Sequence, residues 1–438
     1  MSAAELVSLV VCDLGAIVRG RAVLASELEE PLSRGIGWVP ANHALTPLGP
    51  LAEPSPFGST GDLRLLPDPG TRARVGAPAP GASAFELMLC DIVELDGQPW
   101  PCCPRAFMQR VLGELQEQAG AAVQASFEHE FQLLGAGRAE LPFSLAAQRV
   151  VEPFASELMA ALVEADVEPE RFFGEFASRQ FEVPVAPAPA AQAADRAVLT
   201  REVVREIARR EGRRATFVPL LDPAEAGNGV HLHISLHDAE ARPLLHDSTR
   251  PGELSELGGS FAAGVLAHAS ALSALTAPSP VSCERLTPHR WSAGAVCLGE
   301  RNRETFLRIP PLATLGGASA AGQMRLEYRA ADAAANPHLA LGAIIAAGLD
   351  GIAAGMPSPP ILDRDPSTLD ADEARRYGVG ALPSSLDEAL AALAEDRVLR
   401  AALGEPLYEA FLALKRAELA LVAELPVEQR CLRYAEAY

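Results

Sequence analysis

Two histidines and a serine occupy alternate positions in the stretch GNGVHLHIS, which runs from Gly227 to Ser235. Successive side chains of an extended strand point to opposite faces, so His231, His233 and Ser235 would share one face. The aliphatic residues between them would then face a core. Imidazoles on a solvated face need no function, whereas imidazoles in a cleft act as ligands or charge partners. Taken alone, the stretch is explained by an ordinary half-exposed strand.

Three further segments place charged side chains opposite apolar ones. Their charged residues are Glu128 and Glu130 in SFEHEFQLL, Glu175 and Glu182 in GEFASRQFEVPV, and Arg325, Glu327 and Arg329 in MRLEYRAAD. Each segment on its own is typical of the solvated face of a strand. If strands bring the segments together, however, the carboxylates raise one another's pKa and destabilise the fold unless a cation compensates them.

A divalent cation would resolve this conflict. Carboxylate oxygens with one imidazole favour Mg²⁺ or Mn²⁺ over Zn²⁺, which prefers nitrogen and sulfur ligands. Six ligands are enough to bind two metal ions. Two metal ions beside arginines are typical of sites that transfer phosphoryl groups, because cations neutralise the phosphate oxygens. The residue pattern therefore predicts metal-assisted phosphoryl transfer and leaves the substrate open.

Composition argues against several other functions. The chain has 438 residues and a formal net charge of -20, which argues against nucleic acid or an anionic membrane as a partner. Its only lysine is Lys415, which excludes P-loop, Schiff-base and kinase-type lysine chemistry. The seven cysteines show no metal-finger spacing, and the first residues lack the pattern of a signal peptide. We therefore expect reduced thiols and a cytoplasmic protein.

The elements that must hold these side chains can be outlined from the sequence. Residues 6 to about 100 alternate short apolar runs with turns rich in glycine and proline, which predicts a small β-rich domain. A loop is expected over 186–195, entering a helix that starts near Asp195. The apolar run Leu339–Met356 contains Asp350 and is expected to be a buried helix rather than a membrane span. Helices are predicted near residues 105–119, 153–165, 192–211, 258–276 and 336–355, and again after Gly380.

The polar segments resemble those of the glutamine synthetase family, in the same order along the chain. FEHEF resembles its E-x-E-F strand, QFE its Q-x-E strand, GNGVHLHISL its G-x-G-x-H-x-H-x-S-L segment, and RNRETFLRIP its R-N-R segment. RLEYRAADAAANPHLALGAIIAAGLDG resembles the family's R-x-E-x-R segment and the helix that follows it. The likeness also includes LVVCDLGAIVRG and GDLRLLPDPGT near the N-terminus, so it covers essentially the whole chain.

This resemblance implies an α+β fold with two domains. A β-grasp-like N-terminal domain would span residues 1–103. A catalytic domain that binds ATP and metal, with a curved antiparallel sheet flanked by helices, would span residues 104–438. It further implies a cytoplasmic homo-oligomer of hexameric rings stacked as a dodecamer, with active sites between subunits.

The resemblance also implies a role for each matching residue. The metal ligands would be Glu130, Glu175 and Glu182 for one ion, and Glu128, His231 and Glu327 for the other. The nucleotide would contact His233, Ser235, Arg308 and Arg325. Glutamate would be held by Gly227, Arg285, Arg303 and Arg329, and the transferring phosphoryl group would be stabilised by Arg303 and Arg308. The implied reaction phosphorylates the γ-carboxylate of glutamate with ATP and Mg²⁺ or Mn²⁺, at two or more ions per site, and an amine then attacks the acyl phosphate.

The segments for ammonium depart from the family pattern. Trp291 stands where glutamine synthetases have a glutamate that helps to bind and deprotonate ammonium, and their ammonium-binding aspartate has no evident counterpart in ANHALTPLGPL. Ala226 replaces an asparagine of the glutamate loop. We therefore expect an organic amine, such as a polyamine, ethanolamine or another alkyl or aryl amine. If Arg290 and His289 point inward, they favour an amine without a second positive charge.

Two alternatives remain open at this stage. One is a true glutamine synthetase with a rebuilt ammonium site, and the other is a non-catalytic structural or regulatory member of the family. The complete set of predicted metal ligands argues against a non-catalytic protein, because buried acids without a metal would destabilise the fold. Trp291 is the candidate for the amine site, and its alternative role is packing at a subunit interface.

Overall fold

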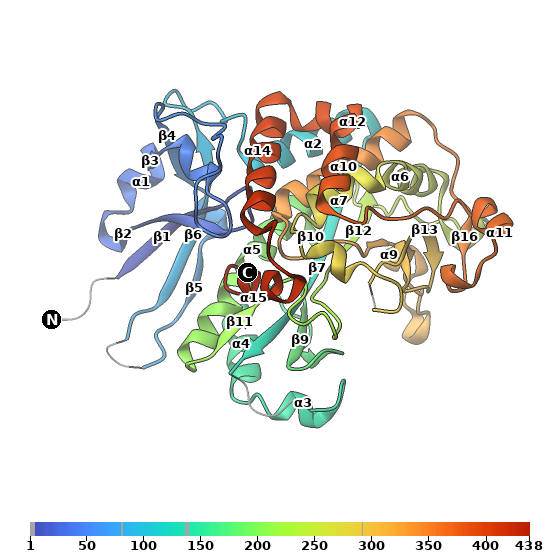
Figure 1. Ribbon diagram of the computed structural model, residues 1–438, viewed down its shortest axis with the longest axis horizontal. Coiled ribbons are helices and arrows are strands. Elements are labelled where there is room, and N and C mark those ends of the chain that lie inside the picture. Colours follow the sequence, from blue (N-terminus) through green and yellow to red (C-terminus); the bar gives the residue numbers. More distant parts are fainter. Residues whose placement is uncertain (1–4, 80–81, 136–139, 291) are drawn as a thin grey trace.

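The computed structural model describes residues 5–79, 82–135, 140–290 and 292–438, which form two sheets with helices packed around the larger one (Figure 1). The smaller sheet lies at one side of the molecule and has the strand order β2-β1-β6-β4-β3, with β5 beside β6. Its strands are β1 (Leu6–Cys12), β2 (Val18–Leu24), β3 (Ile36–Trp38), β4 (Leu63–Pro67), β5 (Ala73–Val75) and β6 (Phe85–Val93). The β-rich N-terminal region predicted from the sequence is therefore confirmed.

The larger sheet has ten strands, in the order β16-β13-β14-β15-β12-β7-β9-β8, with β10 and β11 also paired to β7. Its central pairs are antiparallel, as expected, whereas β13 pairs in parallel with both β14 and β16 at one edge. The strands are β7 (Ala122–Leu134), β8 (Phe173–Gly174), β9 (Gln180–Pro184), β10 (Ala188–Pro189), β11 (Arg214–Thr216), β12 (Val230–His237), β13 (Ala295–Glu300), β14 (Thr305–Ile309), β15 (Leu326–Tyr328) and β16 (Ile361–Leu362). The expected α+β class is confirmed.

The predicted long helices are present with two corrections. The single helix predicted near residues 258–276 is broken at His268 into Glu256–Ala267 and Ala269–Thr276, which are bent by 75°. Helix α5 begins at Ala190, so the alanines that were expected in a loop before Asp195 form its first turn. The helices are α1 (Glu29–Arg34), α2 (Pro104–Ala119), α3 (Leu145–Arg149), α4 (Phe154–Glu164), α5 (Ala190–Arg210), α6 (Glu256–Ala267), α7 (Ala269–Thr276), α8 (Ser282–Arg285), α9 (Ala320–Gln323), α10 (Pro337–Ala353), α11 (Ala371–Arg376), α12 (Leu386–Glu395), α13 (Arg397–Leu403), α14 (Glu405–Val422) and α15 (Val427–Ala435).

Helix α10 is the central helix of the core and packs between α2 and α6. Small residues allow this close approach, because a Cβ on Gly264 of α6 would lie 2.2 Å from the carbonyl oxygen of Ala347 in α10. The predicted burial of this apolar helix is confirmed. Within the described ranges, no single helix is long and apolar enough to cross a membrane. Helices α6 and α7 taken together have the length and composition of a span, but they are bent by 75° relative to each other.

One buried arginine joins the two sheets. Arg105 of α2 donates to Asp195 of α5 at 3.0 and 2.9 Å, and also to Asp68 and Asp91 of the small N-terminal part at 2.8 and 2.9 Å. His338 adds a contact of 2.8 Å to the same Asp195 carboxylate. A guanidinium with several carboxylate partners has both its charge and its donors satisfied. This cluster therefore fixes the small sheet against helices α2 and α5.

A histidine at the bend between α6 and α7 predicts a pH-dependent contribution to stability. His268 Nδ1 lies 2.6 Å from Asp396 and its Nε2 lies 3.2 Å from Asp350. Burial alone would lower the pKa of His268, but the hydrogen bonds to the two aspartates raise it above its ordinary value. The stabilisation is therefore complete below about pH 6.5 and is lost as the pH rises through the folded pKa.

We expect His268→Gln to lower the melting temperature more at about pH 6 than at about pH 9, because only the protonated imidazole gains from both carboxylates. Thermal unfolding of the variant and the parent protein at the two pH values measures this. An equal loss at both would mean that His268 stabilises by packing and not by charge.

Candidate active site

One face of the larger sheet gathers the predicted acids and histidines. Strand β12 lies between β7 and β15, and the register places His231 opposite Glu128 and His233 opposite Glu327. Glu130 lies opposite Glu182 in the next pair, β7 and β9. Residues directly opposite each other in a sheet share a face, so the alternation read from the sequence correctly predicts which side chains share this face, and the register decides which of them meet. They meet as lateral neighbours within one sheet and not across two facing sheets.

The two histidines lie beside the same carboxylate but differ in what their ring nitrogens can do. His231 Nδ1 is 3.6 Å from Glu128, and its buried Nε2 has no hydrogen-bond partner among the described residues. His233 Nδ1 accepts a hydrogen bond of 3.1 Å from Arg325 Nε, so a neutral ring carries its proton on Nε2, 3.1 Å from Glu128. His233 Nε2 is also buried without a hydrogen-bond partner among the described residues, but the lone pair of its Nδ1 is taken by Arg325, which fits the expectation that His231 ligates metal and that His233 donates to the nucleotide.

Three ligand atoms, from Glu128, His233 and Glu327, also lie within 4.8 Å of one another. This grouping includes His233 and not His231, which is the histidine predicted to ligate the metal. Rotation of the His233 ring or loss of the contact with Arg325 would be needed before its nitrogen could ligate an ion, because a protonated nitrogen has no lone pair to give.

The acids of the other predicted metal site repel one another. Glu175 lies on the turn between β8 and β9, and Glu182 lies within β9. Burial, followed by the charges of Glu128, Glu130 and Glu175, raises the pKa of Glu182 to about 11. Burial and Glu130 raise the pKa of Glu175 to about 7. Carboxylates held this close are the donor set that divalent cations prefer, so the residues present fit Mg²⁺ or Mn²⁺.

Glu327 is engaged by two arginines. Arg308 Nη1 lies 2.6 Å from Glu327 Oε2, and Arg329 Nη1 pairs with Oε1 of the same carboxylate. Burial opposes ionisation of Glu327, but Arg329, the nearby histidines and Arg308 outweigh it and lower its pKa to about 2. Glu327 is therefore ionised, and each of its oxygens keeps a second lone pair beside its arginine partner.

Sequence reasoning did not single out the residues that hold Glu130. Gln180 Nε2 donates to Glu130 at 3.1 Å, to the Gly227 carbonyl at 2.9 Å and to Asn228 at 3.1 Å. The backbone N–H of Gly229 donates to the same Glu130 oxygen at 2.8 Å. The signal was available, because Gln180 alternates with Glu182 and so shares its face.

The predicted glutamate-binding residues are brought together only in part. Gly227 is required beside Arg285, because a Cβ at Gly227 would lie 2.7 Å from Arg285 Cγ and 2.1 Å from the Pro219 carbonyl. The Arg303 carbonyl accepts from Arg329 Nε at 3.0 Å, but the Arg303 side chain is exposed and lines a cavity of about 560 Å³. That cavity adjoins the arginine-rich segment at the start of β14.

The remaining predictions are placed as follows. Ser235 lies farther along β12, where its hydroxyl is 3.0 Å from His237. Trp291 lies outside the described residues. Its neighbour Arg290 donates to the carbonyls of Pro223 and Glu225 at 2.7 and 3.1 Å. The Arg290 guanidinium is therefore bound to a loop, which weakens its expected role in repelling a second positive charge.

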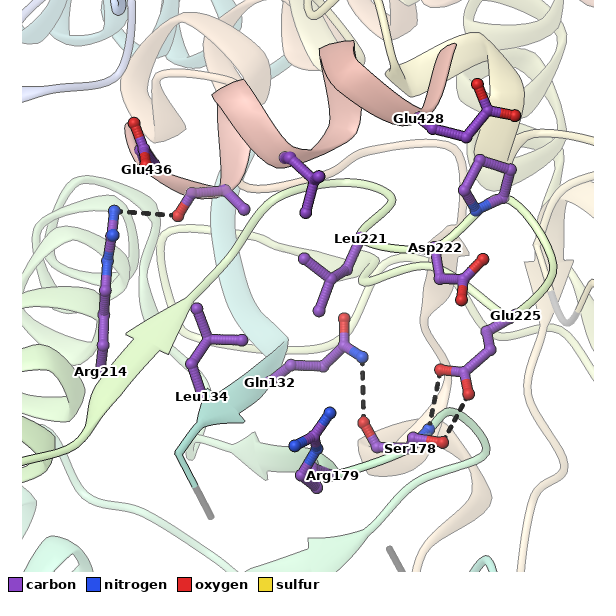
Figure 2. A pocket seen from close by; sticks show the side chains of 13 residues that line it. Gln132, Leu134, Ser178, Arg179, Arg214, Leu221, Asp222, Glu225, Glu428 and Glu436 are labelled. Carbon is purple, nitrogen blue, oxygen red and sulfur yellow. Dashed lines mark hydrogen bonds between the residues drawn. The ribbon is translucent and has the colours of Figure 1, made fainter.

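A cavity of about 720 Å³ lies at the end of β7, beyond Gln132, and contains none of the predicted site residues. Figure 2 shows Glu225 turned toward Ser178 at its wall, where the carboxylate accepts from the Ser178 hydroxyl at 2.5 Å and from its N–H at 3.1 Å. Gln132 donates to the Ser178 carbonyl at 3.0 Å. The acids that could bind metal thus lie outside this larger cavity.

Comparison with known proteins identifies the family. A family model described as the glutamine synthetase N-terminal domain matches residues 1–100, and one described as the glutamine synthetase catalytic domain matches residues 101–434. The chain is 36% identical to the gamma-glutamylpolyamine synthetase GlnA3 of Streptomyces coelicolor, covering 94% of this chain and 89% of that protein. It is 33% identical to the glutamine synthetase of Halobacterium salinarum, covering 86% and 84%.

Solved structures agree with this assignment. A crystal structure described as a novel glutamine synthase homologue has 47% identity and a TM-score of 0.93, over 100% of this chain and 99% of that one. The ligand-free structure of GmaS has 27% identity and a TM-score of 0.82, over 98% and 96%. Enzymes of this family are ATP-dependent glutamate ligases that use divalent metals. Sequence, family models and fold agree along the whole chain, which therefore belongs to the glutamine synthetase family.

Proposed function

We propose that this protein phosphorylates the γ-carboxylate of glutamate with ATP and transfers the γ-glutamyl group to an organic amine. The observation that carries the proposal is the single sheet face on which buried acids, two histidines and the arginines around Glu327 converge. In the first step an oxygen of the γ-carboxylate bonds to the γ-phosphorus of ATP, and ADP leaves. In the second step the amine nitrogen attacks the acyl carbon, phosphate leaves with that oxygen, and the proton lost by the nitrogen passes to the departing phosphate.

The residues would divide this work between two groups of acids. Glu130, Glu175 and Glu182 would hold one divalent ion, and Glu128, His231 and Glu327 the other. When bound, these ions would neutralise phosphate oxygens and orient the carboxylate. Gln180 and the Gly229 N–H both donate to one oxygen of Glu130 and so fix the direction of its side chain. This positioning keeps the reacting groups close, which is where most of the rate enhancement in such reactions arises.

The arginines would act on the phosphoryl group. Arg308 lies opposite Glu327 in the register of β14 and β15, with only 7% of its surface exposed. Once Glu327 ligates an ion, the Arg308 guanidinium would be free to turn toward the charge that develops during transfer. His233 would donate a hydrogen bond from Nε2 to the nucleotide. The donors that stabilise the transition state would thus come from side chains that the sheet already holds beside the acids.

The amine is proposed to be organic because the carboxylates used for ammonium are missing from this sequence. Ammonium is small and strongly hydrated, so a site that selects it needs acids to replace its water. The sequence has a tryptophan, Trp291, in place of one of these acids, and an apolar indole there would suit an amine with a carbon body. The name of the Streptomyces relative, a gamma-glutamylpolyamine synthetase, supports this substrate class. With Arg290 bound to carbonyls, the reason to prefer a monoamine over a polyamine is weaker than the sequence indicated.

We expect the enzyme to prefer an organic amine to ammonium by at least roughly tenfold in kcat/KM, which requires only about 1.4 kcal/mol of differential transition-state binding. Release of ADP with ATP, Mg²⁺, glutamate and a panel of monoamines, ethanolamine, diamines and polyamines measures this. Trp291→Glu should shift the preference toward ammonium. Equal use of ammonium and the best organic amine would identify a true glutamine synthetase, and no ADP release with any amine would point to a non-catalytic member.

A further inference from the structure

The guanidinium of Arg285 faces three different surroundings. Its Nη2 donates to the carbonyls of Ala330 and Ala331, both at 2.9 Å. Its Nη1 reaches the candidate site, where it lies 3.1 Å from the position that a Cβ on Gly229 would occupy. His231 Nε2 and Glu130 Oε1 lie 3.4 and 3.6 Å from that same point. One edge of Arg285 is thus fixed to the backbone, while another converges with two predicted metal ligands above Gly229.

The Nε of Arg285 is unpaired and faces an unpaired oxygen of Asp332, whose carboxylate is also contacted by Ser282 and by the backbone of Ala334. Arg285 Nε is buried without a hydrogen-bond partner among the described residues, and so is Asp332 Oδ2. The two atoms are 3.9 Å apart, and the two side chains are 2% and 0% exposed. The other oxygen of Asp332 accepts from the Ala334 N–H at 3.1 Å. A buried charged donor and acceptor each lose free energy while unpaired, so a small movement that joins them is favourable.

The gap between Arg285 and Asp332 would close by side-chain torsion, because the backbone is held at both residues: the Arg285 carbonyl accepts from the Ser292 hydroxyl at 2.8 Å. The backbone of Asp332 is anchored on both sides, because its N–H donates to Thr276 at 3.0 Å and its carbonyl accepts from Ala335 at 3.1 Å. Arg285 is the last residue of the four-residue helix α8, and its side chain has several rotatable bonds. Because the guanidinium is planar and rigid, a shift that closes the gap to Asp332 would also change the direction of Nη1 above Gly229.

We propose that Asp332 is a positioning residue, whose buried carboxylate closes on Arg285 Nε and aims Nη1 of Arg285 at the α-carboxylate of the bound glutamate. This inference rests on the proposed function, because that function makes Arg285 a glutamate-binding residue. Asp332 does not touch the substrate. It acts by fixing the direction of a guanidinium whose planar geometry suits a carboxylate.

The test compares steady-state kinetics of Asp332→Asn with those of the parent enzyme. Asparagine retains the shape but loses the charge, so we expect the KM for glutamate to rise about tenfold, as one lost charge-assisted hydrogen bond predicts. The KM for ATP should stay within about twofold, because the aspartate acts only through Arg285. Glu284→Gln is the matched control, because Glu284 lies beside Arg285 in α8 but has an exposed carboxylate, 3.7 Å from Arg430. This substitution should leave the KM for glutamate and the KM for ATP unchanged.

A binding measurement separates positioning from loss of folding. The parent protein should gain melting temperature as glutamate is added with Mg²⁺ and an unreactive ATP analogue, and Asp332→Asn should need about ten times more glutamate for the same gain. Unchanged glutamate dependence in Asp332→Asn would overturn the role of Asp332 and leave the proposed function standing. A parent enzyme that neither binds nor consumes glutamate would overturn both.

Discussion

Glu128→Ala and Glu327→Ala are expected to abolish ADP release and to remove most of the rise in melting temperature that Mg²⁺ or Mn²⁺ gives the parent protein. Each substitution removes a charged ligand, and ligand binding to the folded state stabilises it in proportion to affinity. Activity and thermal unfolding with and without metal measure both effects. The exposed Glu409 of α14 offers a matched control, and Glu409→Ala should retain activity and the metal response.

The two variants should differ in their stability without metal. Glu327 is 1% exposed and shared by Arg308 and Arg329, so its removal leaves two guanidinium groups without their carboxylate. Breaking a buried ion pair in this way costs about 3–5 kcal/mol. Glu128 is half-buried between the two histidines, and its loss should cost less. Full activity in both variants would remove these residues from the metal sites.

Arg308→Ala is expected to lower kcat by roughly 10²–10³-fold, the usual effect of removing one donor that stabilises transition-state charge. The KM for ATP should change by less than about threefold, since the interaction belongs to the transition state and not to the bound substrate. Steady-state kinetics with varied ATP at saturating glutamate and amine provides the measurement.

Arg325→Ala supplies the contrast for that experiment. Arg325 donates to His233 and is predicted to contact the nucleotide, so its loss should mainly raise the KM for ATP. If Arg308→Ala instead raised the KM for ATP with kcat intact, Arg308 would be a ground-state binding residue and its assignment to phosphoryl transfer would be wrong.

The polar face of the sheet could be predicted from the sequence because side-chain alternation in a strand is a local property. Residues such as His231, Glu128 and Glu182 needed only the period of two to be assigned to one face. Which carboxylate lies opposite which histidine depends on strand register, which pairs β7 with segments more than a hundred residues away in the chain. The sequence alone therefore predicted the face, and its resemblance to a known family was needed to assign partners.

Other features could not be read from the sequence for identifiable physical reasons. The start of α5 was placed too late because Pro187 and Pro189 suggested a loop, whereas alanine favours the helix as soon as the last proline has passed. The pairing of Arg308 and Arg329 with one carboxylate depends on how β14 and β15 align. Gln180 was overlooked because an amide carries no charge, although its three hydrogen bonds hold together Glu130 and the glycine loop.

The central claim is that this site activates the γ-carboxylate of glutamate as an acyl phosphate, and the fate of its oxygen tests that claim most directly. The enzyme would be supplied with unlabelled ATP, Mg²⁺, an accepted amine, and glutamate carrying ¹⁸O at both oxygens of its γ-carboxylate. The oxygen that bonds to the transferred phosphorus leaves with it when the amine attacks the acyl carbon. The account predicts one ¹⁸O atom in each released phosphate, measured by mass spectrometry. Unlabelled phosphate, formed while the γ-glutamylamide accumulates, would contradict it.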